Sequence, residues 1–400
     1  MFQKLVSHNE AISRLVDRGY AIAFDSGYLV VRDIPYVDAG LRLRWGAIVT
    51  KLVFIDQVRV TLDDHQVFFA GPEDAMPHGL DGKPIPNLGG GATSLALSDV
   101  AKDVVVKRSF SNKPQPAGAF KDLFEKINSY ATIISGPAIE LHGATPYTFR
   151  AVKEVVSDSI FKFHDTMTSR AEITELSAKF NDDVVAVIGL GGSGGYLLDF
   201  LVKTPVKEIR AFDVDVFYVH NAFRSPGRLD EGELGKKKAE VYGARYENFR
   251  TGLSVEPKFI NASSSNELDG VTFAFVAVDK GSSRAGILEA LIARKIPFID
   301  VGLGLHRKDD RLSGMLRTTY CSAERGSTIR SEGLMELQDD PNDEYRVNIQ
   351  TAELNALNAS VAIIRFKQLR GFYVEDDPMY HHLFDIGDLK GQGESETGDH

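Results

Sequence analysis

The residues with the clearest chemical potential form a glycine-rich turn between an apolar run and a helical pattern. Gly189, Gly191, Gly192 and Gly194 all lie within the segment Gly-Leu-Gly-Gly-Ser-Gly-Gly. Glycines allow the backbone to turn sharply and to approach a ligand without Cβ clashes. A helix that begins at such a turn offers free N–H groups and a partial positive charge to a phosphate. The turn therefore indicates nucleotide binding, and the alternative is that the glycines merely pack a helix against a strand.

An acidic pair closes the next strand-like run. Asp213 and Asp215 flank a valine at the end of the run 208–213. A carboxylate at the end of the second strand can accept hydrogen bonds from the ribose hydroxyls of a nucleotide. Enzymes that bind NAD and enzymes that bind ATP share this pattern, so by itself it leaves both open.

Further polar residues follow at fixed distances. Asn221 lies eight positions and Arg224 eleven positions after Asp213, Lys238 closes the segment Gly-Lys-Lys-Lys, and Asp279 follows an apolar run. In this order and spacing the sequence resembles the family of ThiF, MoeB and the ubiquitin-activating enzymes. The resemblance covers about half of the chain, and the motifs are specific together although each is weak singly.

The resemblance implies ATP-dependent adenylation of a carboxylate. It implies that Asp213 holds the ribose and that Asp279 helps to hold Mg²⁺, which usually takes only one or two protein carboxylates. Joining a carboxylate to the α-phosphate brings two anions together, and Arg224 and Lys238 are the cations that would neutralise the triphosphate. The alternatives are a surface salt bridge for Arg224, a solvated basic helix start for Lys238 and a helix N-terminal carboxylate for Asp279.

An arginine ahead of the turn is a further candidate. Ser169 and Glu172 form a capping-box pattern, which predicts that Arg170 occupies the first position of a helix. The family resemblance implies that an arginine on such a helix reaches the γ-phosphate, often from the partner subunit. We therefore expect a homodimer, with an exposed helix arginine as the alternative.

Cys321 is the only cysteine, which excludes a disulfide within the chain and a four-cysteine zinc site. A thiolate attacks acyl-adenylates well, so Cys321 is a candidate to carry the acyl group as a thioester. Arg317 and Arg325 flank it, but no histidine or lysine at a recognisable spacing would activate it. An inert cysteine is the alternative.

The elements that position these residues alternate in type. The second part of the chain is of the α/β class and predicts a doubly wound, mostly parallel sheet in a Rossmann-like adenylation domain, with strands at 183–189, 208–213, 271–278 and 296–301 and helices at 194–204, 282–294 and 349–371. The first part mixes strand-like runs at 28–31 and 47–62 with helical spacing at 120–130, which predicts an α+β domain. We expect domains at 1–150 and 165–390 and a disordered polar tail at 391–400.

The net charge and the lengths of the apolar runs indicate which kinds of partner to expect. The net charge of −10 would repel phosphate backbones, so we expect no nucleic-acid partner. No apolar run approaches the ~20 residues that span a bilayer, and the N-terminus lacks a signal-peptide pattern. We therefore expect a cytoplasmic protein with no membrane partner.

These observations favour an enzyme that uses ATP and Mg²⁺ to adenylate the C-terminal glycine of a ubiquitin-like protein. The domain ahead of the nucleotide fold and the helix that carries Asn355 and Asn358 resemble those of a bacterial branch of the family. That branch is found with ubiquitin-like and ubiquitin-conjugating-enzyme-like partners. An NAD(P)-dependent oxidoreductase and a non-catalytic nucleotide-binding scaffold are the alternatives. The cation set argues against the first, and the completeness of the motifs argues against the second.

Overall fold

The chain divides into two compact units, Met1–Thr174 and Glu175–His400. The computed structural model describes residues 2–25, 27–97, 101–150, 152, 159–163, 165–171, 173–325, 333–335, 337–339 and 349–395. Among these residues, no helix is long and apolar enough to cross a membrane.

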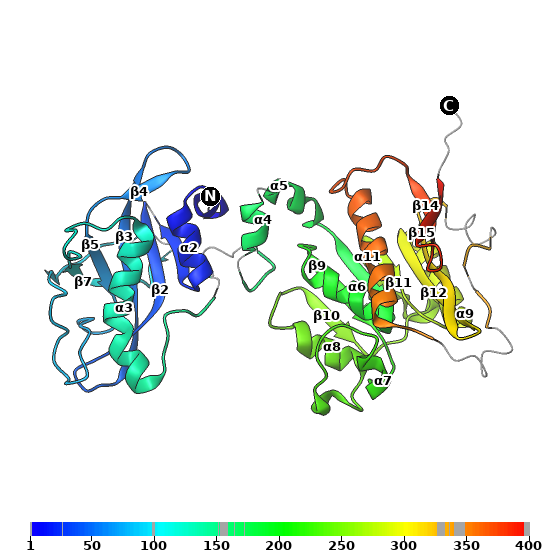
Figure 1. Ribbon diagram of the computed structural model, residues 1–400, viewed down its shortest axis with the longest axis horizontal. Coiled ribbons are helices and arrows are strands. Elements are labelled where there is room, and N and C mark those ends of the chain that lie inside the picture. Colours follow the sequence, from blue (N-terminus) through cyan, green and yellow to red (C-terminus); the bar gives the residue numbers. More distant parts are fainter. Residues whose placement is uncertain are drawn as a thin grey trace. The chain divides into compact units, whose positions relative to one another are not determined.

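The first unit combines an antiparallel sheet with helices (Figure 1). Its helices are α1 (Phe2–Ser7), α2 (Glu10–Arg18), α3 (Leu123–His142) and α4 (Thr166–Arg170). Its strands are β1 (Ala21–Asp25), β2 (Tyr28–Val37), β3 (Leu43–Phe54), β4 (Val60–Leu62), β5 (Gln66–Ala70), β6 (Gly91–Ala92) and β7 (Val106–Ser111). The order is β1-β2-β3-β5-β7-β6, and β4 pairs with β3. The α+β prediction is confirmed, although the predicted strand 47–62 is two strands joined by a turn.

The helix α3 carries a buried lysine into the core of this unit. Asp122 caps the helix by accepting a hydrogen bond from the Glu125 N–H at 2.7 Å. One face of α3 packs on the apolar residues of the sheet. Lys126 on that face is fully buried, donates from Nζ to Thr50 Oγ1 at 2.8 Å and lies 3.8 Å from Asp64 Oδ1. Burial lowers the pKa of Lys126 to about 8.

The second unit is a mixed sheet in the order β10-β9-β8-β11-β12-β13-β14-β15. Its strands are β8 (Val184–Ile188), β9 (Glu208–Phe212), β10 (Leu253–Glu256), β11 (Phe273–Val276), β12 (Phe298–Lys308), β13 (Arg311–Cys321), β14 (Met379–Asp385) and β15 (Lys390–Ser395). Neighbours from β10 to β12 are parallel, and those from β12 to β15 are antiparallel. The strands that the sequence predicts belong to the parallel part of this sheet.

Helices cover both faces of this sheet, which confirms the doubly wound arrangement. The α-helices are α5 (Thr174–Ser177), α6 (Gly192–Val202), α7 (Val219–Ala222), α8 (Lys238–Tyr246), α9 (Gly281–Ala293) and α11 (Ala352–Leu369). Short 3₁₀ helices are η2 (Ala178–Phe180), η3 (Glu231–Glu233) and η4 (Ala262–Leu268). Apolar residues of α6 and α11 pack in one core, and those of α9 and η4 pack in another.

Three predicted boundaries are wrong. The helix α6 begins at Gly192 rather than at 194, because the glycine turn already has helical geometry there. Arg170 is the last residue of α4 rather than the first of a helix, since Asp165 accepts the Thr168 N–H at 2.9 Å near the start of α4. Residues 391–395 belong to β15, where backbone pairing with β14 orders a polar segment. Glu172 and residues 396–400 lie outside the described residues.

We predict that Lys126 makes the stability of the first unit depend on pH. Between pH 8 and 10.5 the unfolded chain binds more protons than the folded chain at this site, so the stability should rise with pH. Lys126→Met should abolish this rise, which amounts to about 1.6 kcal/mol between pH 8 and 9.5. Denaturation can be followed by the fluorescence of Trp45, the only tryptophan, which lies on β3. Parallel pH profiles for the two proteins would contradict the assignment.

Candidate nucleotide-binding site

Three glycines of the turn after β8 are required by contacts within the protein. Gly189 has φ +93°, and a Cβ there would lie 2.5 Å from the carbonyl oxygen of Ala277. A Cβ at Gly194 would overlap the carbonyl oxygen of Gly189, and one at Gly192 would overlap the side-chain amide of Asn355. At these three positions, close packing within the protein is enough to explain why the residue is glycine.

Gly191 differs from its neighbours. It is the N-cap residue of α6, has φ −71° and ψ −151°, and would place a Cβ in space with no heavy atom within 4 Å. No side chain caps the helix at this position. Neither packing nor a positive φ explains a glycine here, whereas a ligand that approaches the backbone does. The helix N-terminus and the open space beside it fit a phosphate group.

The side chain of Asp213 holds the glycine-rich turn by a hydrogen bond to its backbone. Its Oδ2 accepts the N–H of Leu190 at 2.7 Å, and its Oδ1 accepts the N–H of Asp215 at 2.8 Å. The residue is buried, so its carboxylate has one orientation relative to the turn. A ribose hydroxyl can reach such a carboxylate when the phosphates lie at the start of α6.

Lys238 lies against both predicted carboxylates. It is the first residue of α8 and is buried, with Nζ 2.8 Å from Asp215 Oδ2 and 3.6 Å from Asp213 Oδ2. The interpretation as a solvated basic helix start is therefore wrong for Lys238. Lys237, the N-cap residue of α8, instead donates from Nζ to the Val214 carbonyl at 2.6 Å.

Asn221 and Arg224 lie in and just after α7. Asn221 is buried, and its Oδ1 accepts the N–H of Tyr218 at 2.8 Å, so this oxygen stabilises the start of α7. The Nε of Arg224 is buried and has no hydrogen-bond partner among the described residues. A buried donor without a partner is costly and rare.

Asn355 on α11 is a site residue whose role the sequence did not reveal. It is almost fully buried, accepts the hydroxyl of Ser193 on its Oδ1 at 2.9 Å, and donates from Nδ2 to the Arg224 carbonyl at 3.3 Å. One amide thus ties the first turn of α6 to the segment that carries Arg224. The available signal was an asparagine on the apolar side of a predicted helix.

Asp279 lies at the same edge of the sheet as the glycine turn. The strands β8 and β11 are parallel neighbours, and the Ala277 N–H bonds the Ile188 carbonyl at 2.8 Å. Asp279 is exposed and precedes α9 by two positions. It is not the helix cap, because Lys280 is the N-cap residue and Asp339 Oδ1 accepts the Ser282 N–H at 3.0 Å.

A metal ion at this site would need ligands from the bound nucleotide as well as from the protein. Among the described residues, no three His, Cys, Asp or Glu side chains form a group that could hold a metal ion. Asp279 alone would leave most of the coordination sphere to phosphate oxygens and water, which is common for Mg²⁺. The donor set fits a magnesium ion that arrives with a nucleotide.

Two predicted residues remain, Arg170 and Cys321. Arg170 belongs to the first unit, and its side chain is outside the described part of the structure. Cys321 ends β13 with no exposed surface and packs in the apolar cluster beneath α9. Burial raises the pKa of its thiol to about 12. A buried thiol of this kind is a poor nucleophile, which favours the inert interpretation.

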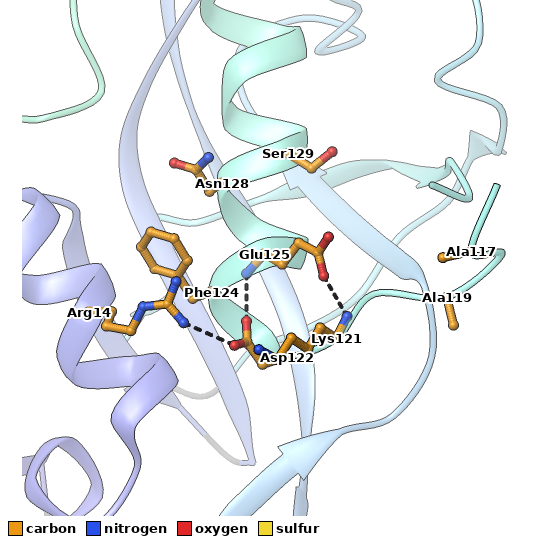
Figure 2. A pocket seen from close by; sticks show the side chains of 9 residues that line it. All are labelled: Arg14, Ala117, Ala119, Lys121, Asp122, Phe124, Glu125, Asn128 and Ser129. Carbon is orange, nitrogen blue, oxygen red and sulfur yellow. Dashed lines mark hydrogen bonds and ion pairs between the residues drawn. The ribbon is translucent and has the colours of Figure 1, made fainter. Parts of the chain in front are cut away.

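The first unit contains a separate pocket of about 560 Å³ beside α2 and the start of α3 (Figure 2). The guanidinium of Arg14 lies 4.0 Å from the centre of the Phe124 ring and 3.1 Å from Asp122 Oδ2. The Lys121 N–H bonds Glu125 Oε2 at 2.6 Å. These contacts stay within the pocket wall.

Comparison with known proteins identifies the class of the second unit. Residues 167–365 match the ThiF family, so the chain contains a ThiF-family domain, and the resemblance is confirmed. Residues 10–166 match a domain of unknown function, DUF6791.

Two curated relatives are tRNA threonylcarbamoyladenosine dehydratases. The one from Haemophilus influenzae is 25% identical over 129 residues, which are 31% of this chain and 49% of the relative. The one from Escherichia coli is 27% identical over 127 residues, which are 31% and 47%. The chain thus spans about half the length of the relatives it matches. Because these relatives are named for a tRNA nucleoside, they give no support to the expectation that nucleic acid is excluded.

Solved structures with a similar fold include E. coli MccB with ATP, with 16% identity, a TM-score of 0.42 and coverage of 57% of this chain and 69% of that one. E. coli TcdA, a tRNA N6-threonylcarbamoyladenosine dehydratase in complex with AMP, has 19% identity, a TM-score of 0.40 and coverage of 51% and 93%. PaaA has 15% identity, a TM-score of 0.41 and coverage of 57% and 70%.

We predict that Gly191→Ala and Gly194→Ala separate binding from folding. The methyl group at 191 has room in the protein but would occupy the proposed phosphate space, so ATP affinity should fall at least about ten-fold while the melting temperature changes little. The methyl group at 194 overlaps backbone and should lower the melting temperature. Calorimetric titration with ATP and thermal unfolding measure both. Unchanged ATP affinity in Gly191→Ala would remove this turn as the phosphate site.

Proposed function

We propose that the ThiF-family domain uses ATP to adenylate a carboxylate substrate. The supporting observation is the convergence of the turn, the acidic pair and the cations at one sheet edge. Asp213 links the Leu190 N–H to Lys238, and Asn355 links Ser193 to the backbone of Arg224. A dinucleotide enzyme would need the turn and the ribose carboxylate but not this pair of cations. The oxidoreductase alternative is therefore disfavoured.

In the proposed reaction, the phosphates lie at the N-terminus of α6 and the ribose hydroxyls at Asp213. A substrate carboxylate oxygen attacks the α-phosphorus, the bond to the bridging oxygen of the β-phosphate breaks, and pyrophosphate leaves. Arg224 and Lys238 stabilise the charge that develops. Asp279 would hold Mg²⁺ together with phosphate oxygens. Asp215 orients Lys238, since it makes the shorter of the lysine's two ion pairs.

We propose the C-terminal glycine of a ubiquitin-like protein as the substrate, with a ubiquitin-conjugating-enzyme-like protein as a further partner. This rests on the order and spacing of Asp213, Asn221, Arg224 and Lys238, which resemble those of ubiquitin-activating enzymes. A modified tRNA nucleoside is a second candidate, because both curated relatives are named for one. A non-catalytic scaffold would bind ATP without turnover.

We further propose a homodimer in which Arg170 of one subunit serves the site of the other. The surface beside Arg224 is suited to association, because Val219 is 50% exposed and Phe223 is 79% exposed. Burial of such large apolar side chains between copies would be favourable. A monomer in sedimentation analysis of the ATP-bound protein would exclude this arrangement.

ATP–pyrophosphate exchange tests the proposed activity. Arg224→Ala should lower the exchange rate by about 10²–10³, because one charge-stabilising group is lost from the transition state. The matched control is Arg228→Ala. Arg228 is nearby in sequence, its side chain is 89% exposed, and its ion pair with Asp230 is a long surface contact of 3.8 Å. The control should retain nearly full activity. Equal losses in both variants would refute the role of Arg224.

The same assay distinguishes the substrates. Exchange that depends on a ubiquitin-like protein ending in glycine supports the preferred substrate, and exchange that depends on modified tRNA supports the second. Tight ATP binding without exchange in the presence of either would support the scaffold and refute the enzyme.

Cys321 should be dispensable for both adenylation and transfer. Its thiol is buried and has a pKa of about 12, so it is not available as a thiolate near neutral pH. Cys321→Ala should exchange pyrophosphate and modify its acceptor at the parent rate. Mass spectrometry of the denatured enzyme after incubation with ATP and partner checks this directly. A mass gain that is lost on reduction and absent from Cys321→Ala would show a thioester.

A further inference from the structure

A buried charge network lies in the second unit beside the proposed site. Asp300 on β12 is fully buried and pairs with two arginines. Its Oδ1 lies 3.0 Å from Arg284 Nε on α9, and its Oδ2 lies 2.5 Å from Arg317 Nη2 on β13. Arg317 also donates to the Thr319 hydroxyl at 3.0 Å, and this hydroxyl lies 2.9 Å from His381 Nδ1.

Buried ion pairs of this kind often add little net stability, because desolvation offsets the attraction between the charges. The location of the network is therefore more informative than its strength. It joins the antiparallel strands β12, β13 and β14 to the helix α9, which begins directly after the turn that carries Asp279.

Arg284 connects this network to the proposed metal ligand. Its Nη2 donates to the carbonyl oxygen of Val278, the residue immediately before Asp279. The same guanidinium therefore contacts Asp300 and the backbone that leads into Asp279. A guanidinium is planar and holds its donors in fixed directions, so both contacts are fixed together.

The second arginine orients the carboxylate between them. Arg317 pairs with Oδ2 of Asp300, and Arg284 pairs with Oδ1, so each carboxylate oxygen has an arginine partner. Gly302 on β12 makes room for this contact, since a Cβ there would lie 2.9 Å from Arg317 Nη2. Larger residues at 302 would displace the guanidinium.

We propose that Arg284, oriented by Asp300, is a positioning residue for Asp279. It holds the Val278 carbonyl and so limits the positions that the Asp279 carboxylate can take. The role rests on the proposed function of Asp279 in holding Mg²⁺ with the triphosphate. Arg284 acts through the backbone and is not itself a catalytic residue.

Arg284→Lys in the full chain tests this role. Lysine keeps the charge and can pair with Asp300, but it cannot hold the carboxylate and the carbonyl with one planar group. In the nucleotide-free protein, amide hydrogen exchange should become faster in the peptide 276–284. In the complex with a non-hydrolysable ATP analogue, the affinity for Mn²⁺ should fall by about ten-fold, as is usual for loss of an outer contact at a metal site.

Arg250→Lys is the matched control. Arg250 is 2% exposed and donates to the carbonyl oxygen of Thr204, just beyond the end of α6, and to that of its neighbour Thr251. The control should lower the melting temperature without changing hydrogen exchange in 276–284 or Mn²⁺ affinity.

The outcomes separate the two proposals. Unchanged hydrogen exchange in Arg284→Lys overturns the positioning role. Faster hydrogen exchange combined with an unchanged affinity for Mn²⁺ also overturns it. Equal effects in Arg250→Lys also overturn it, because they would show general loosening of the unit. A parent protein that binds Mn²⁺ with the analogue but exchanges no pyrophosphate refutes adenylation, while the loss of Mn²⁺ affinity in Arg284→Lys still supports the positioning role.

Discussion

The site depends on the hydrogen bond from the Leu190 N–H to the Asp213 carboxylate. This bond joins the turn after β8 to the end of β9, and the parallel pairing of these strands brings the two ends together. The other oxygen of the Asp213 carboxylate accepts the Asp215 N–H, so this carboxylate is hydrogen-bonded to the backbone on both sides. Because the carboxylate is buried, the nearby ammonium of Lys238 is needed to balance its charge.

The helix α11 acts as a brace for this arrangement. Phe366 packs in the same core as α6, and Asn355 spans the gap between α6 and the segment of Arg224. Gly192 is required at the point where Asn355 meets α6. The glycines of the turn therefore serve two purposes, since some permit close packing and Gly191 leaves room for a ligand.

The antiparallel half of the sheet carries a buried charge network that reaches the turn before Asp279. The strands β12 and β13 pair along their whole length and carry the ion pairs of Asp300. Through Arg284 they contact the turn before Asp279. Cys321 lies at the end of β13, in a core position where its side chain packs as a small apolar group.

The sequence by itself determined the class of fold, because apolar runs, glycine turns and fixed spacing are local signals. The same signals predicted the candidate site residues from Gly189 to Asp279, whose roles remain predictions. The sequence predicted the wrong helix position for Arg170, because Asp165 accepts a backbone N–H near the start of α4. It also predicted disorder at residues 391–395, which pair with β14. Only the tertiary structure decided that Lys238 is buried against Asp213, that Cys321 is sealed in a core and that Asn355 joins two segments. Contacts between residues distant in sequence fix burial and partners, and no local pattern encodes them.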